Sequence, residues 1–108
     1  MNSTLFSLQV PLSAICLCNR SACFLKMGHH EKALADASSV VETSPEYIKG
    51  WFRKGMSLHA MGRYQEALPV LGKSAEMEPK NKQVKQALQF CEVKLQQEMR
   101  KRMQGSNA

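Results

Sequence analysis

Three side chains that carry hydrogen-bond donors are spaced so that they can meet one ligand. Lys49 and Arg53 are four positions apart, which places them on the same face if the segment is a helix. Asn19 lies 34 positions before Arg53, and 34 residues is the period of an internal repeat in this chain. An ammonium, a guanidinium and an amide all donate hydrogen bonds, and two of them are positively charged. Converging on one volume, Asn19, Lys49 and Arg53 would suit a carboxylate.

Catalytic and metal-binding patterns do not stand out in the chain. No nucleophile-base-acid set, phosphate-binding loop or paired-carboxylate motif is apparent. Cys16, Cys18 and Cys23 follow a C-x-C-x4-C spacing, which differs from the usual zinc patterns. We interpret these thiols as small buried side chains of a helix. We therefore expect no enzymatic activity, no metal and no cofactor.

Composition and charge are those of a globular domain that favours anionic partners. The chain has 108 residues, of which 44% are hydrophobic and 22% charged, and its formal net charge is +6. This length corresponds to one domain. The positive charge favours nucleic acid, an acidic membrane or an acidic peptide. Much of it lies late in the chain, at Lys80, Lys82, Lys85, Lys94, Arg100, Lys101 and Arg102.

The start of the chain does not have the pattern of an export signal. It carries no Lys or Arg before Arg20, Pro11 interrupts its apolar stretch, and that stretch is too short to span a membrane. Four cysteines in such a chain fit a reducing compartment. We expect a cytoplasmic protein without disulfides.

An internal repeat organises the sequence. At a 34-residue offset the chain aligns with itself at Gly28 and Gly62, Ala33 and Ala67, Leu34 and Leu68, Glu42 and Glu76, and Pro45 and Pro79. Each unit contains two amphipathic runs of helical period that are separated by the glycine and closed by the proline. Such units are helical hairpins. The predicted helices span residues 12–27, 30–43, 47–61, 64–77 and 82–102.

The two units resemble the tetratricopeptide repeat (TPR), a 34-residue helical hairpin. The second unit matches the family pattern at Trp51, Gly55, Leu58, Tyr64, Ala67 and Pro79, and the first matches more loosely at Leu17, Ser21, Phe24, His30, Ala33 and Pro45. The resemblance implies an all-α, right-handed solenoid of two hairpins over residues 14–81. Residues 82–103 would form a capping helix, after a divergent leader at 1–13 and before a flexible tail at 104–108.

The resemblance extends to co-chaperone TPR domains whose carboxylate clamp grips the C-termini of Hsp70 or Hsp90. The strings NRSACFLKMG and KGWFRKG are similar to two parts of that clamp and contain Asn19, Lys49 and Arg53. The family clamp also takes a Lys and an Asn from a preceding repeat, whose place is held here by residues 1–13. Three of the five clamp positions therefore carry over. The resemblance implies an adaptor that binds the acidic C-terminal tail of a chaperone.

Two other functions stay open. One is a scaffold that joins partner proteins through its helix faces without a clamp, and the other is contact of the basic C-terminal helix with nucleic acid or an acidic membrane. Sparse aromatic residues, 6% of the chain, disfavour nucleic acid. Because two repeats cover their ends poorly, we also expect one of two arrangements at the N-terminal face. Either the chain self-associates there, or Leu5, Phe6, Leu8 and Val10 fold back onto it.

Overall fold

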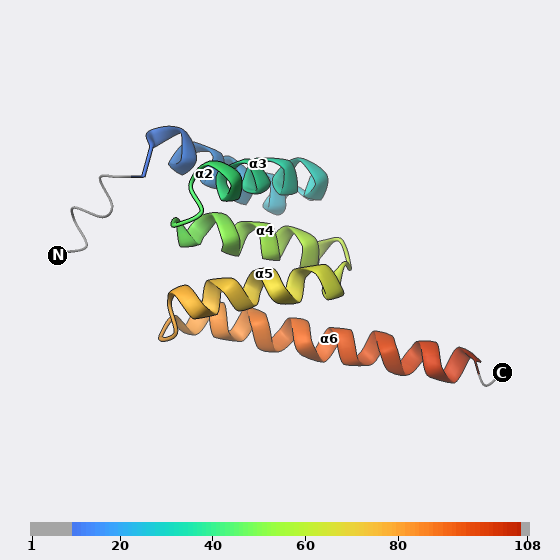
Figure 1. The fold of residues 1–108 in the computed structure, drawn as a ribbon. Coiled ribbons are helices and arrows are strands. Elements are labelled where there is room, and N and C mark those ends of the chain that lie inside the picture. Colours follow the sequence, from blue (N-terminus) through green and yellow to red (C-terminus); the bar gives the residue numbers. More distant parts are fainter. Residues whose placement is uncertain (1–9, 107–108) are drawn as a thin grey trace.

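The chain folds as a stack of antiparallel helices. The structure is a computed structural model that describes residues 10–106, and all regular elements in that range are helices. They are α2 (Leu12–Met27), α3 (His30–Thr43), α4 (Ile48–Ala60), α5 (Tyr64–Met77) and α6 (Lys82–Ser106). Each helix packs against the next one along the chain, while α4 also contacts α2 and α6. Figure 1 shows the resulting stack, with the α2–α3 hairpin at one end and α6 at the other.

Glycine makes the tight reversal inside each hairpin. Gly28 and Gly62 have φ angles of +81° and +76°, in the left-handed region where a side chain would be strained. Just after each glycine, the backbone N–H of His29 donates to Phe24 O at 2.8 Å and that of Arg63 donates to Leu58 O at 2.9 Å. The same turn therefore recurs one repeat later, as the sequence predicts.

Small residues bring the helices of the stack into close contact. Ala33 and Ala67 are fully buried, and the Ser21 hydroxyl on α2 donates to the carbonyl of Ala33 on α3 at 2.8 Å. A Cβ atom added to Gly50 would lie 2.7 Å from Val40 Cγ1, and one added to Gly55 would lie 2.5 Å from Leu71 Cδ2. Larger residues at these positions would push the helices apart.

Two hydrophobic clusters hold the stack together. The larger one joins α4, α5 and α6 through Phe52, Leu58, Ala67, Leu71, Val84 and Cys91. The smaller one joins the first hairpin and contains Val10, Ala14, Cys18 and Val40. Val10 thus packs onto the first hairpin, which agrees with the expectation that the start of the chain folds back onto it. The other residues of that expectation, Leu5, Phe6 and Leu8, lie outside the described residues.

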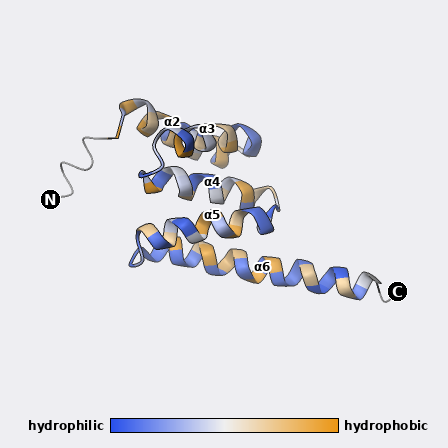
Figure 2. Ribbon diagram, in the orientation of Figure 1, coloured by the Kyte–Doolittle hydropathy of each residue, from blue (hydrophilic) through white to orange (hydrophobic). Residues whose placement is uncertain are grey.

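Helix α6 caps the second hairpin. Asn81 caps its N-terminus, where its side-chain oxygen accepts from the Val84 N–H at 3.2 Å. The Cys91 thiol lies 3.5 Å from the Tyr64 carbonyl oxygen on α5. The last turns of α6 extend past the start of α5 (Figure 1). Hydrophilic and hydrophobic residues alternate along its length (Figure 2).

Several sequence-based boundaries and burial assignments need correction. Helix α4 is one residue shorter at each end than predicted, and α6 continues to Ser106, so residues 104–106 of the expected tail are helical. Residues 107–108 lie outside the described residues. Met99 and Met103 lie at apolar positions of the helical pattern, which predicts burial, but they are 55% and 69% exposed, because the last turns of α6 extend past the start of α5 (Figure 1).

The close approach of α4 to α5 gives a stability test. Gly55→Ala should destabilise the fold by about 1–3 kcal/mol, because its Cβ would overlap the side chain of Leu71, which is fully buried. Urea unfolding followed by circular dichroism measures the change.

Gly72→Ala is the matched control. A Cβ at Gly72 meets nothing within 4 Å inside α5, so this change should stabilise the helix by about 0.5–1 kcal/mol. Equal effects of the two substitutions would contradict the packing described here.

Candidate functional site

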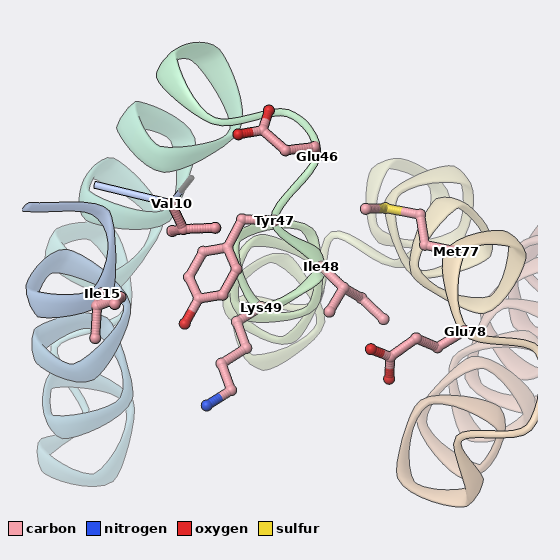
Figure 3. A pocket seen from close by; sticks show the side chains of 8 residues that line it. All are labelled: Val10, Ile15, Glu46, Tyr47, Ile48, Lys49, Met77 and Glu78. Carbon is pink, nitrogen blue, oxygen red and sulfur yellow. The ribbon is translucent and has the colours of Figure 1, made fainter. Parts of the chain in front are cut away.

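A groove lies beside the N-terminal ends of α2 and α4 and the α5–α6 turn. It has a volume of about 720 Å³ and is lined by Val10, Ile15, Glu46, Tyr47, Ile48, Lys49, Met77 and Glu78. In Figure 3, Tyr47 and Lys49 point to the same side, between Ile15 on α2 and Glu78 at the turn. The groove therefore combines an apolar lining with one ammonium and two carboxylates.

Lys49 also lines a smaller adjoining recess with Arg53. This recess has a volume of about 130 Å³, and Phe52, Val84 and Asn81 contribute to its walls. Arg53 Cζ lies 5.7 Å from the centre of the Phe52 ring. The structure thus brings Lys49 and Arg53 to one concave region, as their spacing of one helical turn predicts.

The guanidinium of Arg53 is partly buried and incompletely satisfied. Its Nε atom is buried and has no hydrogen-bond partner among the described residues. A buried donor without an acceptor costs about 1–3 kcal/mol, and more when the group is charged. An acceptor supplied by a ligand would remove that cost.

The charges of Arg53 and Lys49 act on the thiol of Cys18 on α2, and the charge of Arg53 also acts on the phenol of Tyr47. Burial raises the pKa of the Cys18 thiol, while the charges of Arg53 and Lys49 act in the opposite direction. Burial also raises the pKa of the Tyr47 phenol, and the charge of Arg53 acts to lower this pKa. The positive potential of Lys49 and Arg53 therefore extends across the space between α4 and α2.

Neither groove cation is neutralised by an ion pair within residues 10–106. The ion pairs there join Arg20 to Asp36 at 2.7 Å and Arg63 to Glu66 at 2.5 Å. Lys49 is exposed, and its ammonium remains available to an anion.

Asn19 is exposed on α2 and belongs to the lining of neither the groove nor the recess. Its meeting with Lys49 and Arg53 around one ligand remains a prediction.

Sequence reasoning missed the two carboxylates at the groove. Glu46 precedes α4, and Glu78 accepts a hydrogen bond from the Asn81 amide at 2.9 Å. Both lie in loops, where the repeat alignment carries little information. Ile15, in contrast, lies one repeat before Lys49, so the same offset that selected Asn19 would have found it.

A second cluster of rings lies further along α4. The His59 ring is 5.0 Å from the ring of Tyr64 and 5.1 Å from that of Phe90. Lys94 lies over the Phe90 ring at 5.5 Å. Burial, aided by the charge of Lys94, lowers the pKa of His59. This cluster joins α4, α5 and α6.

Two of the three cysteines that were expected to be buried, Cys16 and Cys23, are exposed. Cys18 and Cys91 are buried, but Cys16 and Cys23 are exposed, and all four are free thiols. Within residues 10–106 no group of three or more His, Cys, Asp or Glu side chains could hold a metal ion. None of the helices described is long and apolar enough to cross a membrane.

The lowered pKa of His59 makes the fold sensitive to mild acid. The unfolded chain takes up a proton near the ordinary pKa of 6.5, whereas the folded chain resists it to lower pH. Stability should therefore fall as the pH drops below about 6.5. In His59→Gln the difference in Tm between neutral pH and mildly acidic pH should shrink, as measured by thermal denaturation.

Lys94→Gln provides a graded comparison because it removes the smaller of the two causes. Its pH dependence should lie between those of the wild type and His59→Gln. An unchanged Tm difference in His59→Gln would assign the acid sensitivity to other groups.

Comparison with known proteins agrees with the observed geometry. Residues 48–81 match the tetratricopeptide repeat. The chain is 36% identical over 78 residues to small glutamine-rich tetratricopeptide repeat-containing protein 2 of Mycosarcoma maydis, covering 72% of this chain and 22% of that protein. It is 33% identical over 73 residues to Hsp70-Hsp90 organizing protein 2 of Arabidopsis thaliana, covering 68% of this chain and 13% of that protein. The chain thus spans less than a quarter of either relative.

A solved structure supports the same assignment. The Sgt2 TPR domain from Aspergillus fumigatus aligns with a TM-score of 0.76 and 31% identity, over 81% of this chain and 59% of that one. The 34-residue period, the glycine turns and the stacked helical hairpins of this chain are features of a tetratricopeptide repeat. The chain is therefore an all-α tetratricopeptide-repeat solenoid that resembles the TPR domains of co-chaperones.

Proposed function

We propose that the chain is a protein-interaction module that binds the acidic C-terminal tail of another protein through Asn19, Lys49 and Arg53. One observation carries the proposal: among residues 10–106 Arg53 Nε is buried without a hydrogen-bond partner, and the exposed ammonium of Lys49, which lines the same recess, forms no ion pair. A carboxylate accepts hydrogen bonds from both groups and neutralises both charges. No other function accounts for this pair as directly.

A chain terminus suits the site better than an internal acidic residue. The terminal residue offers a carboxylate next to a backbone N–H, and capture of such termini is an established mode of peptide recognition. The recess of about 130 Å³ next to Arg53 holds only a small group. We therefore place the terminal carboxylate there, and the upstream residues of the peptide along the larger groove.

The lining of the larger groove sets a limit on the ligand's charge. Glu46 and Glu78 lie on that surface together with Ile15, Ile48 and Met77. Their carboxylates would repel acidic side chains that lie against them, whereas the apolar residues favour an apolar side chain. The preferred tail therefore ends in a carboxylate and contains an apolar residue a few positions upstream.

The relatives support a chaperone as the owner of that tail. One of them is named as an organizer of Hsp70 and Hsp90, and we extend this class of partner to the present chain. The exposed free thiols Cys16 and Cys23 fit a reducing compartment, so we place the protein in the cytoplasm. The adaptor role requires no catalysis, metal or cofactor.

A scaffold function is the second candidate, because apolar side chains are exposed away from the groove. Phe90 and Val93 on α6 are 54% and 44% exposed, and Leu12 and Met27 on α2 are 74% and 64% exposed. Such residues can join a partner without a terminal carboxylate. Binding that does not depend on the peptide's C-terminus would favour this alternative.

The carboxylate is the feature to test in solution. A short acidic peptide with a free C-terminus should bind the wild type, and its amidated form should bind at least about tenfold more weakly, because amidation removes the terminal charge. Higher salt should weaken binding of the free acid through screening. Isothermal titration calorimetry measures both effects.

Substitutions separate the roles of the three side chains. Arg53→Ala should raise the dissociation constant most, by about tenfold or more, and Lys49→Ala and Asn19→Ala by less. Lys54→Ala is the matched control, because it removes the same charge from the same helix outside the groove lining. If Lys54→Ala weakens binding as much as Arg53→Ala, net charge rather than a clamp attracts the peptide.

A further inference from the structure

The face of α2 that points away from the stack carries an apolar stripe. Its members are Leu12, Cys16, Cys23 and Met27, all exposed. At 3.6 residues per turn they fall within about 60° of the helix circumference. The buried residues Ala14, Cys18 and Ser21 lie on the opposite side, where α2 contacts α3 and α4.

The stripe is symmetric about the middle of α2. The helix spans Leu12–Met27, so its midpoint falls between Asn19 and Arg20. Leu12 and Met27 are equally far from that point, and so are Cys16 and Cys23. Two copies of α2 packed antiparallel about a two-fold axis would therefore place Leu12 against Met27 of the other copy, and Cys16 against Cys23. Such reciprocal pairing is the property that a two-fold interface requires.

The charges of α2 fit the same arrangement. Its two cationic residues, Arg20 and Lys26, would face Asn19 and Ser13 of the other copy, so no like charges meet. Arg20 already donates from Nε and Nη2 to Asp36 at 2.7 Å. A polar pair in the middle of an apolar stripe fixes the register of paired helices.

We propose that the partner of this face is a second copy of the chain, joined through an antiparallel pair of α2 helices. Lys49 and Arg53 lie on α4 and stay free for a ligand, whereas Asn19 lies within the helix pair and is withdrawn from it. The interface of two helices about 24 Å long is small, so the dimer forms in the micromolar range or above. Residues 1–9 are the rival occupant of the face, and the concentration dependence below distinguishes the two.

Disulfide trapping tests the register without any peptide ligand. Cys16→Ser leaves Cys23 on the stripe, and Cys23→Ser leaves Cys16. In the antiparallel pair Cys16 is level with Cys23 of the other copy, whereas like cysteines are about 10 Å apart along the axis. A disulfide needs Cα atoms within about 7 Å. With a mild thiol oxidant such as diamide, the mixed variants should form covalent dimer at least about tenfold faster than either variant alone.

The free association is measured under reducing conditions by sedimentation velocity over a range of concentrations. Leu12→Glu and Met27→Glu should each raise the dimer dissociation constant at least about tenfold, since each places a carboxylate against an apolar side chain at both ends of the pair. Gln89→Glu, which adds a carboxylate at an exposed position of α6, should leave it unchanged. Leu12 and Met27 are mostly exposed, so folding is unaffected, and circular dichroism checks this.

Two results would overturn the proposal. One is a chain that stays monomeric at all concentrations, as expected if residues 1–9 occupy the face. The other is trapping that proceeds as fast with a single variant as with the mixture, which would exclude the antiparallel register. Neither result bears on the binding of a peptide by Lys49 and Arg53, because Leu12, Met27 and Gln89 line neither the groove nor the recess.

Discussion

The close approach of neighbouring helices is the constraint on which the rest of the structure depends. It is made possible by residues with little or no side chain at the contacts, namely Gly50, Gly55, Ala33 and Ala67. Because α4 lies close to both α3 and α5, it is fixed in position and direction. Its groove-facing side chains are therefore presented by a rigid element, which is what a binding site of defined geometry needs.

That rigidity explains how an incompletely satisfied cation can be maintained. Arg53 belongs to the helix whose Phe52 and Leu58 form part of the larger cluster, and the guanidinium lies beside the Phe52 ring. Its Nε atom is buried and has no hydrogen-bond partner among the residues that the structure describes. The packing of the core offsets this cost in the free protein, and we propose that a carboxylate ligand recovers it on binding. The mixed lining of the adjoining groove would then select among acidic tails.

Much of the fold could be predicted because the sequence encodes the same helical hairpin twice. Three helices have the predicted boundaries, and the glycine turns and buried alanines recur from one unit to the next. The errors occur where repetition ends. Helix α6 has no following hairpin among residues 10–106, and its amphipathic pattern predicted burial for Met99 and Met103, which are 55% and 69% exposed. Cys16 and Cys23 are exposed for the same reason at the other end of the stack.

The candidate site was less predictable than the fold. Spacing alone placed Lys49 and Arg53 together, because they are about one helical turn apart. Glu46 and Glu78 line the groove from loops, and helical periodicity does not predict where loop residues lie. The buried state of Arg53 Nε depends on how α4 packs against its neighbours, and a residue's type does not reveal this. Positions on regular elements can thus be inferred from sequence, while burial and loop contacts require the structure.

The most direct measurement of the central claim follows the Nε–H resonance of Arg53 by NMR during titration with an acidic peptide. Arg53→Lys identifies the resonance by its loss. If the terminal carboxylate accepts a hydrogen bond from this group, the free-acid peptide should shift the resonance downfield and slow its exchange with water, and the amidated peptide should do neither. A peptide that binds while the Arg53 resonance stays unchanged would contradict the account.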